Sequence, residues 1–224
     1  MTLTVALIGR GRIGAGVAEW LMSAPGYVLG GVAGRGDALP PAQLTIDTAG
    51  PAALRQHGAA ALEQGDLWTV GAAALADPEF RAHLEAVARR SGHRLRLFTG
   101  WITGPALCPP SVSSRLAITQ SAPGLAPREG EIFHGPLSQA AEQFPDHLNT
   151  ATAAAICGPG IAATSIRLVC TPDGGPHVIH ARFEMPGQVI ETETTFGADG
   201  SALHPVTAAI IAALDRQADW VRYG

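Results

Sequence analysis

The chain has 224 residues, 46% of them hydrophobic, and a formal net charge of −4 at pH 7. A chain of this length can bury one large hydrophobic core or two smaller ones. Because the charges are spread along the sequence without a basic block, nucleic acid and anionic membranes are not expected partners. The first apolar run, at residues 2–8, is too short for a signal peptide or a membrane span.

The cysteines are odd in number and show no C-x-x-C spacing. This pattern argues against a disulfide framework and against a zinc knuckle, and it suits a reducing compartment. We therefore expect a cytoplasmic protein without a metal site. The cysteines are Cys108, Cys157 and Cys170.

Lysine is absent, since all fifteen basic residues are arginine. A Schiff base to pyridoxal phosphate and a P-loop lysine are therefore impossible. A Tyr-x-x-x-Lys reductase pair is excluded for the same reason, as are amino-acid dehydrogenases that use a catalytic lysine. Histidine becomes the leading candidate for acid–base chemistry near neutral pH.

Residues 2–14, TLTVALIGRGRIG, join an apolar run to a G-x-G-x-x-G motif, and an amphipathic segment follows at once. A strand, a tight glycine turn and a helix together offer backbone N–H groups and a positive helix end to a pyrophosphate. Gly9 allows the turn, Gly11 lets the phosphates approach, and Gly14 lets helix and strand pack closely. The cofactor-binding residues expected here are Gly9, Gly11, Arg12, Ile13 and Gly14.

The first hundred residues alternate short apolar runs with helical patterns, as a parallel α/β sheet requires. Asp77-Pro78-Glu79 has the pattern of an N-cap, a proline in the first turn and an acidic first turn, and Ser91-Gly92 should end that helix. Strands are expected at 2–8, 27–33, 44–47, 66–70 and 94–99, and helices at 13–23, 51–63 and 78–90.

The pattern changes near Pro109, beyond which the strands alternate in polarity. Pro186-Gly187 suits a type II turn between the last two strands. The final three strands, at 164–170, 177–185 and 188–196, are expected to form an antiparallel meander. Further strands are expected at 115–120 and 131–133, and helices at 137–144, 151–157 and 206–214.

These elements predict an α/β protein with two domains. Residues 1–108 form a Rossmann dinucleotide-binding domain, and residues 109–204 form a smaller α+β domain with an antiparallel or mixed sheet. A C-terminal helix within 205–224 packs back on the first domain. The ligand is expected in the cleft between the domains.

The second strand lacks the carboxylate that normally holds the ribose 2′-OH of NAD, because Gly34 falls where that acid is expected. Its absence removes repulsion toward a 2′-phosphate, and Arg35 can pair with such a phosphate. The sequence therefore favours NADP over NAD, with Gly34 and Arg35 at the cofactor. The alternative is that Arg35 is a solvated loop residue and Asp37 serves the ribose.

Strand alternation divides the segment HVIHARFEM, residues 177–185, into two faces. The apolar face should pack on helices, so His180 on the other face points away from that layer. In a two-domain dehydrogenase that other face often covers the nicotinamide, although a solvated surface histidine has the same pattern. The two faces are Ile179, Ala181, Phe183 and Met185 on one side, and Val178, His180, Arg182 and Glu184 on the other.

Segments along nearly the whole chain together resemble the L-aspartate dehydrogenase family. Residues 48–77 contain stretches similar to its third and fourth β-α units. Residues 133–151 are similar to its "F-x-G … A … F-P-x-N-x-N-x-A" segment, and residues 180–184 fall where it has an "N-x-H-E-I-E" strand. Residues 201–209 also resemble its C-terminal helix, so the segments occur in the right order.

This resemblance implies the reversible NAD(P)-dependent oxidative deamination of L-aspartate to iminosuccinate, which hydrolyses to oxaloacetate and ammonia. His180 matches the family's catalytic histidine, and Asn149 matches its cofactor- and substrate-site asparagine. A neutral imidazole near the reacting amine can act as base or activate water on the imine. Asn149 also has the pattern of a helix N-cap before residues 150–157.

The loop after the fifth strand departs from the family. Relatives have "G-A-I-x-G-L-D-A-L", whereas residues 100–107 are GWITGPAL, so an indole replaces a methyl group and an aspartate is lost. The family contacts nicotinamide from this loop through its backbone, so Trp101 is expected at the cofactor, or else it fills the domain interface. Because the chain lacks lysine, arginine, backbone N–H groups or hydroxyls must bind the substrate carboxylates. The expected substrate-binding residues are Asn149, Arg182 and Thr103. Arg167 is the alternative strand arginine, and His177 and His134 are further candidates expected on the surface.

The resulting hypothesis is a cytoplasmic, homodimeric, NAD(P)-dependent L-aspartate dehydrogenase, or a close relative. It would bind a dicarboxylic amino acid or oxo acid and ammonia. Two alternatives stay open. One is an imine or keto-acid reductase whose pocket is altered by Trp101, and the other is a non-catalytic NAD(P)-binding regulatory protein.

Overall fold

The computed structural model describes residues 2–34, 36–100, 102, 109, 111–197 and 203–218. Its chain forms two compact units, each with its own sheet. Unit 1 comprises Met1–Phe98 and Leu203–Gly224, and unit 2 comprises Thr99–Ala202. Unit 2 thus begins directly after the last strand of the first sheet, whereas the composition of the sequence changes only near residue 109.

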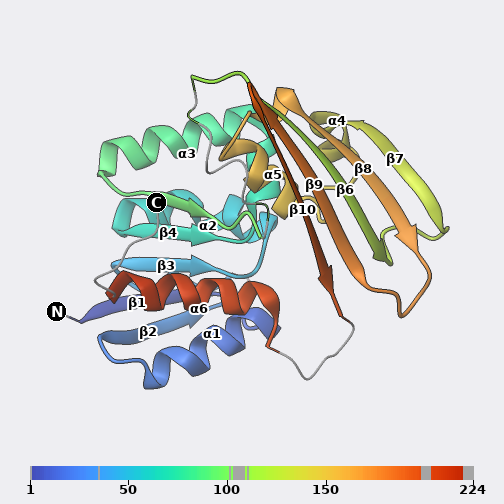
Figure 1. Cartoon of the computed structure of the whole chain (residues 1–224). Coiled ribbons are helices and arrows are strands. Elements are labelled where there is room, and N and C mark those ends of the chain that lie inside the picture. Colours follow the sequence, from blue (N-terminus) through green and yellow to red (C-terminus); the bar gives the residue numbers. More distant parts are fainter. Residues whose placement is uncertain are drawn as a thin grey trace. The chain divides into compact units, whose positions relative to one another are not determined.

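Unit 1 contains a parallel five-stranded sheet in the order β2-β1-β3-β4-β5 (Figure 1). The chain runs from β1 outward to β2 and then crosses to β3 on the other side of β1. This reversal creates a topological switch point at the carboxyl ends of β1 and β3, where α/β sheets bind ligands. The elements are β1 (Leu3–Ile8), α1 (Arg12–Ser23), β2 (Tyr27–Ala33), β3 (Leu44–Asp47), α2 (Pro51–Gln64), β4 (Asp66–Thr69), η1 (Ala72–Ala76), α3 (Pro78–Ser91), β5 (Leu95–Leu97) and α6 (Pro205–Ala218).

The central strands of unit 1 are buried on both faces, which explains their continuous apolar runs. Val5, Ala6 and Leu7 are consecutive in β1 and alternate between its faces, and like Ile46 of β3 they have no exposed surface. Ile210 and Leu214 of α6 belong to the same core, which also contains Val17 and Leu21 of α1. The C-terminal helix is therefore an integral part of unit 1, although more than a hundred residues separate it from β5 in the sequence.

The local signals at the ends of α3 are confirmed. The Asp77 side chain accepts hydrogen bonds from the N–H groups of Glu79 and Phe80, and Pro78 begins the helix. These bonds and the Arg55 guanidinium lower the pKa of Asp77. Gly92 ends the helix in the left-handed conformation, at φ +76°.

Unit 2 contains a mixed five-stranded sheet in the order β10-β9-β6-β8-β7 (Figure 1). The Rossmann-like parallel sheet and this second mixed sheet confirm the predicted α/β fold class. Within the described residues, no helix combines the length and apolarity needed to cross a membrane. The elements of unit 2 are β6 (Arg115–Pro123), β7 (Gly130–Pro136), α4 (Leu137–Gln143), α5 (Asn149–Ile156), η3 (Ile161–Ala163), β8 (Thr164–Thr171), β9 (His177–Met185) and β10 (Gln188–Phe196).

The predicted three-stranded meander is wrong, because β6 lies between β8 and β9. Leu116 of β6 pairs in parallel with Thr164 of β8 and antiparallel with Phe183 of β9. Strands that are consecutive in sequence pair reliably when a tight turn joins them. Residues 172–176, PDGGP, instead carry the chain past the end of β6 to His177, where β9 begins. Only β9 and β10 form the expected hairpin, with Gly187 at φ +78° in its turn.

The sheet of unit 2 has one buried face and one more polar face, as strand alternation predicts. Ile179, Ala181 and Phe183 of β9 are buried, whereas Arg182 and Glu184 are exposed. The strand β6 follows the same alternation from Leu116 to Ala122. The predicted division of β9 into two faces is therefore confirmed.

Candidate functional site

The glycine turn of unit 1 has the geometry expected of an anion-binding elbow. Gly9 adopts φ +106°, which favours glycine. A Cβ at Gly14 would collide with the Gly9 carbonyl oxygen, so Gly14 allows the helix to pack on the turn. A Cβ at Gly11 would meet no atom within 4 Å. The backbone at Gly11 is therefore open to a ligand.

Helix α1 begins at this opening without a protein group that neutralises its end. Gly11 is the N-cap, no side chain caps the helix, and its first turn contains no acidic residue. Arg12 is exposed at the first helical position, while the Ile13 side chain packs against the core of unit 1. The open glycine, the uncapped N–H groups and the basic residue suit a dinucleotide pyrophosphate.

The loop after β3 packs against the glycine turn, which the sequence motif did not predict. Thr48 Oγ1 donates a hydrogen bond of 2.8 Å to the carbonyl oxygen of Ile8. Cβ atoms built at Gly9 and Gly14 would each lie 2.8 Å from the same hydroxyl. Thr48 therefore packs against the glycine turn at the switch point of the sheet.

At the end of β2, the carboxylate of Asp37 is held by two donors. It accepts hydrogen bonds from Gly34 N–H at 2.8 Å and from Arg10 Nη2 at 2.7 Å. Arg10 Nη2 also donates to the carbonyl oxygen of Val32, and Arg10 Nη1 would lie 3.1 Å from a Cβ at Gly34. The Gly34 N–H bond and Arg10 lower the pKa of Asp37. Arg35 lies outside the described residues.

His180 occupies the polar face of the sheet in unit 2 and is half-buried. It pairs in register with Thr119 of β6 and with Glu193 of β10. The prediction that His180 faces away from the buried layer is therefore confirmed.

His177 begins the same strand, and its environment is more unusual. By alternation it shares the face of Ile179 and Ala181, and its Nε2 is buried without a hydrogen-bond partner among the described residues. Its ring lies 5.3 Å, centroid to centroid, from that of Phe196. Burial, and to a lesser extent nearby His147, lowers the pKa of His177. A lone buried imidazole nitrogen of this kind is a signal for function.

His147, which contributes to the lowered pKa of His177, precedes the start of α5 in the sequence. His147 is exposed and lies two positions before Asn149, the first residue of that helix. The N-cap is Leu148 and no side chain caps the helix, so the capping interpretation of Asn149 is wrong. Asn149 is half-buried and is engaged in an interaction of its own. The sequence offered His177 only as a further candidate expected on the surface, whereas in the structure its Nε2 is buried.

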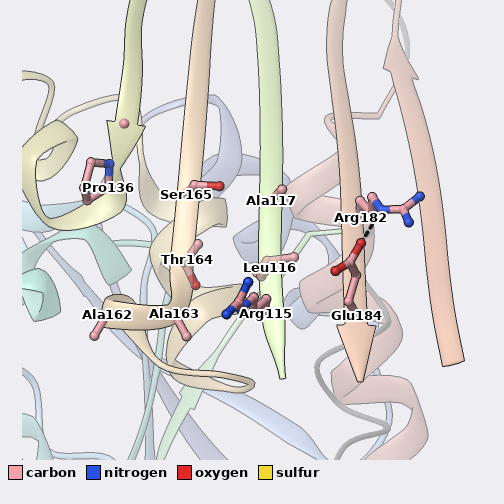
Figure 2. A pocket seen from close by; sticks show the side chains of 11 residues that line it. Arg115, Leu116, Ala117, Pro136, Ala162, Ala163, Thr164, Ser165, Arg182 and Glu184 are labelled. Atoms are coloured by element: carbon pink, nitrogen blue, oxygen red, sulfur yellow. Dashed lines mark hydrogen bonds and ion pairs between the residues drawn. The ribbon is translucent and has the colours of Figure 1, made fainter. Parts of the chain in front are cut away.

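Arg182 lines a hollow of about 610 Å³ on the polar face of the unit 2 sheet. Figure 2 shows the ion pair between Arg182 and Glu184 on β9, and Arg115 of β6 and Ser165 of β8 line the same hollow. Arg182 pairs with Glu184 at 2.6 Å and with Glu191 at 2.5 Å. Its charge is therefore already neutralised by two carboxylates.

The remaining expected site residues, Trp101 and Thr103, lie outside the described residues. Across the part of the chain that the structure describes, no three His, Cys, Asp or Glu side chains are grouped to hold a metal ion. Of the cysteines, Cys157 is exposed and Cys170 is buried, and both are free. The described candidates are thus the glycine turn in unit 1 and the histidines with Asn149 in unit 2.

The parallel sheet with its open glycine turn, combined with a second mixed sheet, places the chain in the class of two-domain Rossmann-type dehydrogenases. L-aspartate dehydrogenase from Ruegeria pomeroyi is 32% identical over 214 residues, covering 78% of this chain and 76% of the relative. L-aspartate dehydrogenase from Ralstonia nicotianae is 33% identical, covering 80% of this chain and 84% of the relative. The chain belongs to the L-aspartate dehydrogenase family.

Two further comparisons agree with this assignment. A family model described as "Aspartate dehydrogenase, C-terminal" matches residues 114–215. The crystal structure of aspartate dehydrogenase from Thermotoga maritima has a TM-score of 0.78 and 18% sequence identity, with 100% of each chain covered. A hyperthermophilic archaeal homoserine dehydrogenase in complex with NADPH has a TM-score of 0.55 and 10% identity, covering 96% of this chain and 98% of that one. These two structures support the fold.

Proposed function

We propose that this chain is an NAD(P)-dependent L-aspartate dehydrogenase. The observation that carries the proposal is the 32–33% identity to curated L-aspartate dehydrogenases over 78–80% of the chain. The reaction removes a hydride from Cα and a proton from the amine of L-aspartate. The product, iminosuccinate, adds water and releases ammonia to leave oxaloacetate, and ammonia with oxaloacetate drives the reverse reaction.

The residues of unit 1 bind the cofactor in this proposal. The N–H groups at the start of α1 and the open backbone at Gly11 receive the pyrophosphate, with Arg12 adding positive charge. Gly9 and Gly14 shape the turn, and the Ile13 backbone belongs to its first helical residues. When bound, the nicotinamide supplies the acceptor for the hydride.

Two histidines are candidates for the proton transfer, and we favour His177 over His180. The Nε2 of His177 is buried and unpartnered, and its lowered pKa keeps the imidazole neutral and able to take the amine proton. His147, whose charge contributes to this lowering, lies two positions before the proposed cofactor and substrate ligand Asn149. His180, indicated by the family resemblance, lies on the opposite face of the sheet and is the alternative.

The proposed substrate ligands are Asn149, Arg182 and Thr103. Asn149 can orient a carboxylate or the nicotinamide without adding charge. Arg182 would have to exchange Glu184 or Glu191 for a substrate carboxylate, which makes it the weaker candidate. Trp101, in the same loop as Thr103, is proposed to contact the nicotinamide through its backbone.

NADP is the proposed preferred cofactor. Gly34 leaves no carboxylate at the usual ribose-binding position, and Arg10 adds a guanidinium beside Gly34 to the expected contribution of Arg35. Asp37 is the residue that would favour NAD, because its carboxylate can accept a ribose hydroxyl. Its ion pair with Arg10 offsets the repulsion that it would exert on a 2′-phosphate.

The proposal also includes the organisation of the protein. Residues 1–108 would bind the cofactor, residues 109–204 would bind substrate and support a homodimer, and the helix within 205–224 would complete the first domain. The free cysteines Cys157 and Cys170 are compatible with a reducing cytoplasm.

The decisive experiment follows NADPH oxidation with ammonia and a panel of 2-oxo acids. We expect turnover with oxaloacetate, and L-aspartate with NADP⁺ should give the reverse reaction. Pyruvate, which lacks the second carboxylate, and 2-oxoglutarate, whose chain is one carbon longer, are the controls. Turnover only with another oxo acid would favour a different reductase, and cofactor binding without any turnover would favour a regulatory protein.

A further inference from the structure

A buried carboxylate lies at the carboxyl end of β3 in unit 1, at the edge of the sheet where the cofactor is proposed to bind. Asp47 ends β3 and has no exposed surface. Its Oδ2 accepts a hydrogen bond of 2.6 Å from Thr69 Oγ1, and its Oδ1 accepts one of 2.9 Å from the N–H of Ala49. The Gly50 N–H also donates to this carboxylate. All of its partners are donors.

Thr69, the last residue of β4, extends this network to a second loop. Its Oγ1 donates to Asp47 and accepts a hydrogen bond of 2.8 Å from the N–H of Gly71. The two loops also touch through their backbones, because a Cβ at Gly71 would lie 2.5 Å from the carbonyl carbon of Gly50. Asp47 and Thr69 therefore tie the loops after β3 and β4 together.

The first of these loops supports the glycine turn. Thr48 lies between Asp47 and Ala49, and its hydroxyl contacts the turn at Ile8 O and beside Gly9 and Gly14. A shift of the Ala49 backbone would therefore move Thr48 against the turn. The carboxylate acts on the ligand site through the loop, because it is itself buried.

We propose that Asp47 and Thr69 are positioning residues for dinucleotide binding, which hold the loop at 48–50 against the glycine turn. This inference rests on the proposed cofactor function of unit 1. Burying a carboxylate is costly, and here burial raises the pKa of Asp47 despite its hydrogen bonds. His57 of α2 is the titratable group that faces it and lowers that pKa. If Asp47 served only packing, an apolar side chain could replace it at lower cost. The N–H groups of Ala49 and Gly50 in the loop after β3 need its carboxylate oxygens as hydrogen-bond acceptors.

The experiment compares NADPH dissociation constants, measured by nucleotide fluorescence, for the wild type and four variants. Thr69→Val keeps the shape of the side chain but loses the hydroxyl, and we expect it to weaken binding about tenfold. Thr69→Ser keeps the hydroxyl and should restore affinity to within about twofold of the wild type. Asp47→Asn should weaken binding at least as much as Thr69→Val, because its NH2 group would face a donor.

Thr45→Val is the matched control. Thr45 is also buried in the parallel sheet, on β3, but its hydroxyl has no hydrogen-bond partner among the described residues. It should bind NADPH as the wild type does. Melting temperatures without nucleotide separate loss of affinity from loss of folding.

Thr48→Val tests the same inference without disturbing the buried network, because Thr48 is only half-buried. We expect it to weaken NADPH binding as well. If the wild type binds NADPH but Thr69→Val, Asp47→Asn and Thr48→Val bind it equally well, the positioning role is overturned. If the wild type binds neither NADPH nor NADH, the proposed cofactor function fails together with the inference.

Discussion

His177 and His180 lie three positions apart on β9, and strand alternation therefore places them on opposite faces of one sheet. The face of the sheet decides which histidine His147 can influence, and His147 contributes to the lowered pKa of His177. Of these two histidines, His177 has a buried Nε2 without a hydrogen-bond partner among the described residues, a property that it shares with His57 of unit 1. A proton acceptor must reach its proton and be neutral, and the lowered pKa of His177 satisfies the second condition.

If His177 is the base, His177→Ala should lower kcat for aspartate oxidation by a factor on the order of 10²–10⁴. His180→Ala, the matched change on the opposite face, should retain near-wild-type kcat. Steady-state kinetics with saturating cofactor would measure both. The reverse outcome would assign the base to His180.

The pH profile offers an independent test at the same residues. Because His177 has a lowered pKa, activity should persist below pH 6.5 and be lost as the pH falls through that pKa. His147 contributes to the lowering, so His147→Gln should raise the pKa of His177 and move the acid limb of kcat/KM to higher pH. An acid limb that stays in place would separate His147 from the catalytic group.

The cofactor preference can be tested at Arg10 and Asp37. Arg10→Ala should weaken NADPH binding about tenfold and affect NADH less, since a 2′-phosphate loses a charged partner. Asp37→Asn should weaken NADH binding more than NADPH binding, because the amide accepts a ribose hydroxyl less well. Arg35→Ala tests the arginine indicated by the sequence. Equal effects on both nucleotides would contradict a role in selectivity.

At the scale of elements, α6 shows how a helix can belong to a distant part of the chain. Ile210, Ala213 and Leu214 complete the core that α1 and the sheet form. The Tyr27 hydroxyl of β2 also donates a hydrogen bond of 2.6 Å to the carbonyl oxygen of Leu214. The helix therefore stabilises unit 1 by burial and by this bond.

Ile210→Ala should lower the free energy of unfolding by about 2–5 kcal/mol, because Ile210 has no exposed surface. Ile211→Ala makes the same chemical change one position along, at a half-buried residue, and should cost clearly less. Urea unfolding with linear extrapolation measures both values. Equal losses of unfolding free energy in the two variants would mean that α6 does not pack on unit 1 through the face of Ile210 and Leu214.

For the whole molecule, the path of the chain predicts a coupled response to cofactor. The chain leaves unit 1 after Phe98 and returns at Leu203. Thr207 near the start of α6 contacts the first turns of α1, since a Cβ at Gly16 would lie 2.8 Å from its methyl group. A ligand on the N-terminus of α1 should therefore stabilise α6 as well.

Hydrogen exchange measured with and without NADPH should show added protection at α6 together with β1 and α1. Gly11→Asp is the matched control, because the fold leaves room for its side chain but the carboxylate repels a pyrophosphate. This variant should lose the nucleotide-dependent protection in all three elements. Protection confined to β1 and α1 would contradict the coupling.

Local rules account for the parts of the fold that the sequence predicted well. β2, β3, β9 and β10 have the expected bounds, and Asp77 and Gly92 begin and end α3 as their side-chain chemistry requires. The glycine turn was also predictable, because Gly9 adopts a positive φ and Gly14 packs on the carbonyl oxygen of Gly9, and both constraints lie within a few residues. The family resemblance added His180 and Asn149, which no local rule identifies.

The sequence by itself determined the strand–turn–helix elbow, the amphipathic periods and the two faces of β9, since these depend on neighbours in the chain. Tertiary structure alone decided that β6 separates β8 from β9, that Asp37 pairs with Arg10, and that the Nε2 of His177 is buried. These arrangements depend on which distant segments meet and on what water they exclude. Neither property has a period or a spacing that can be read along the chain.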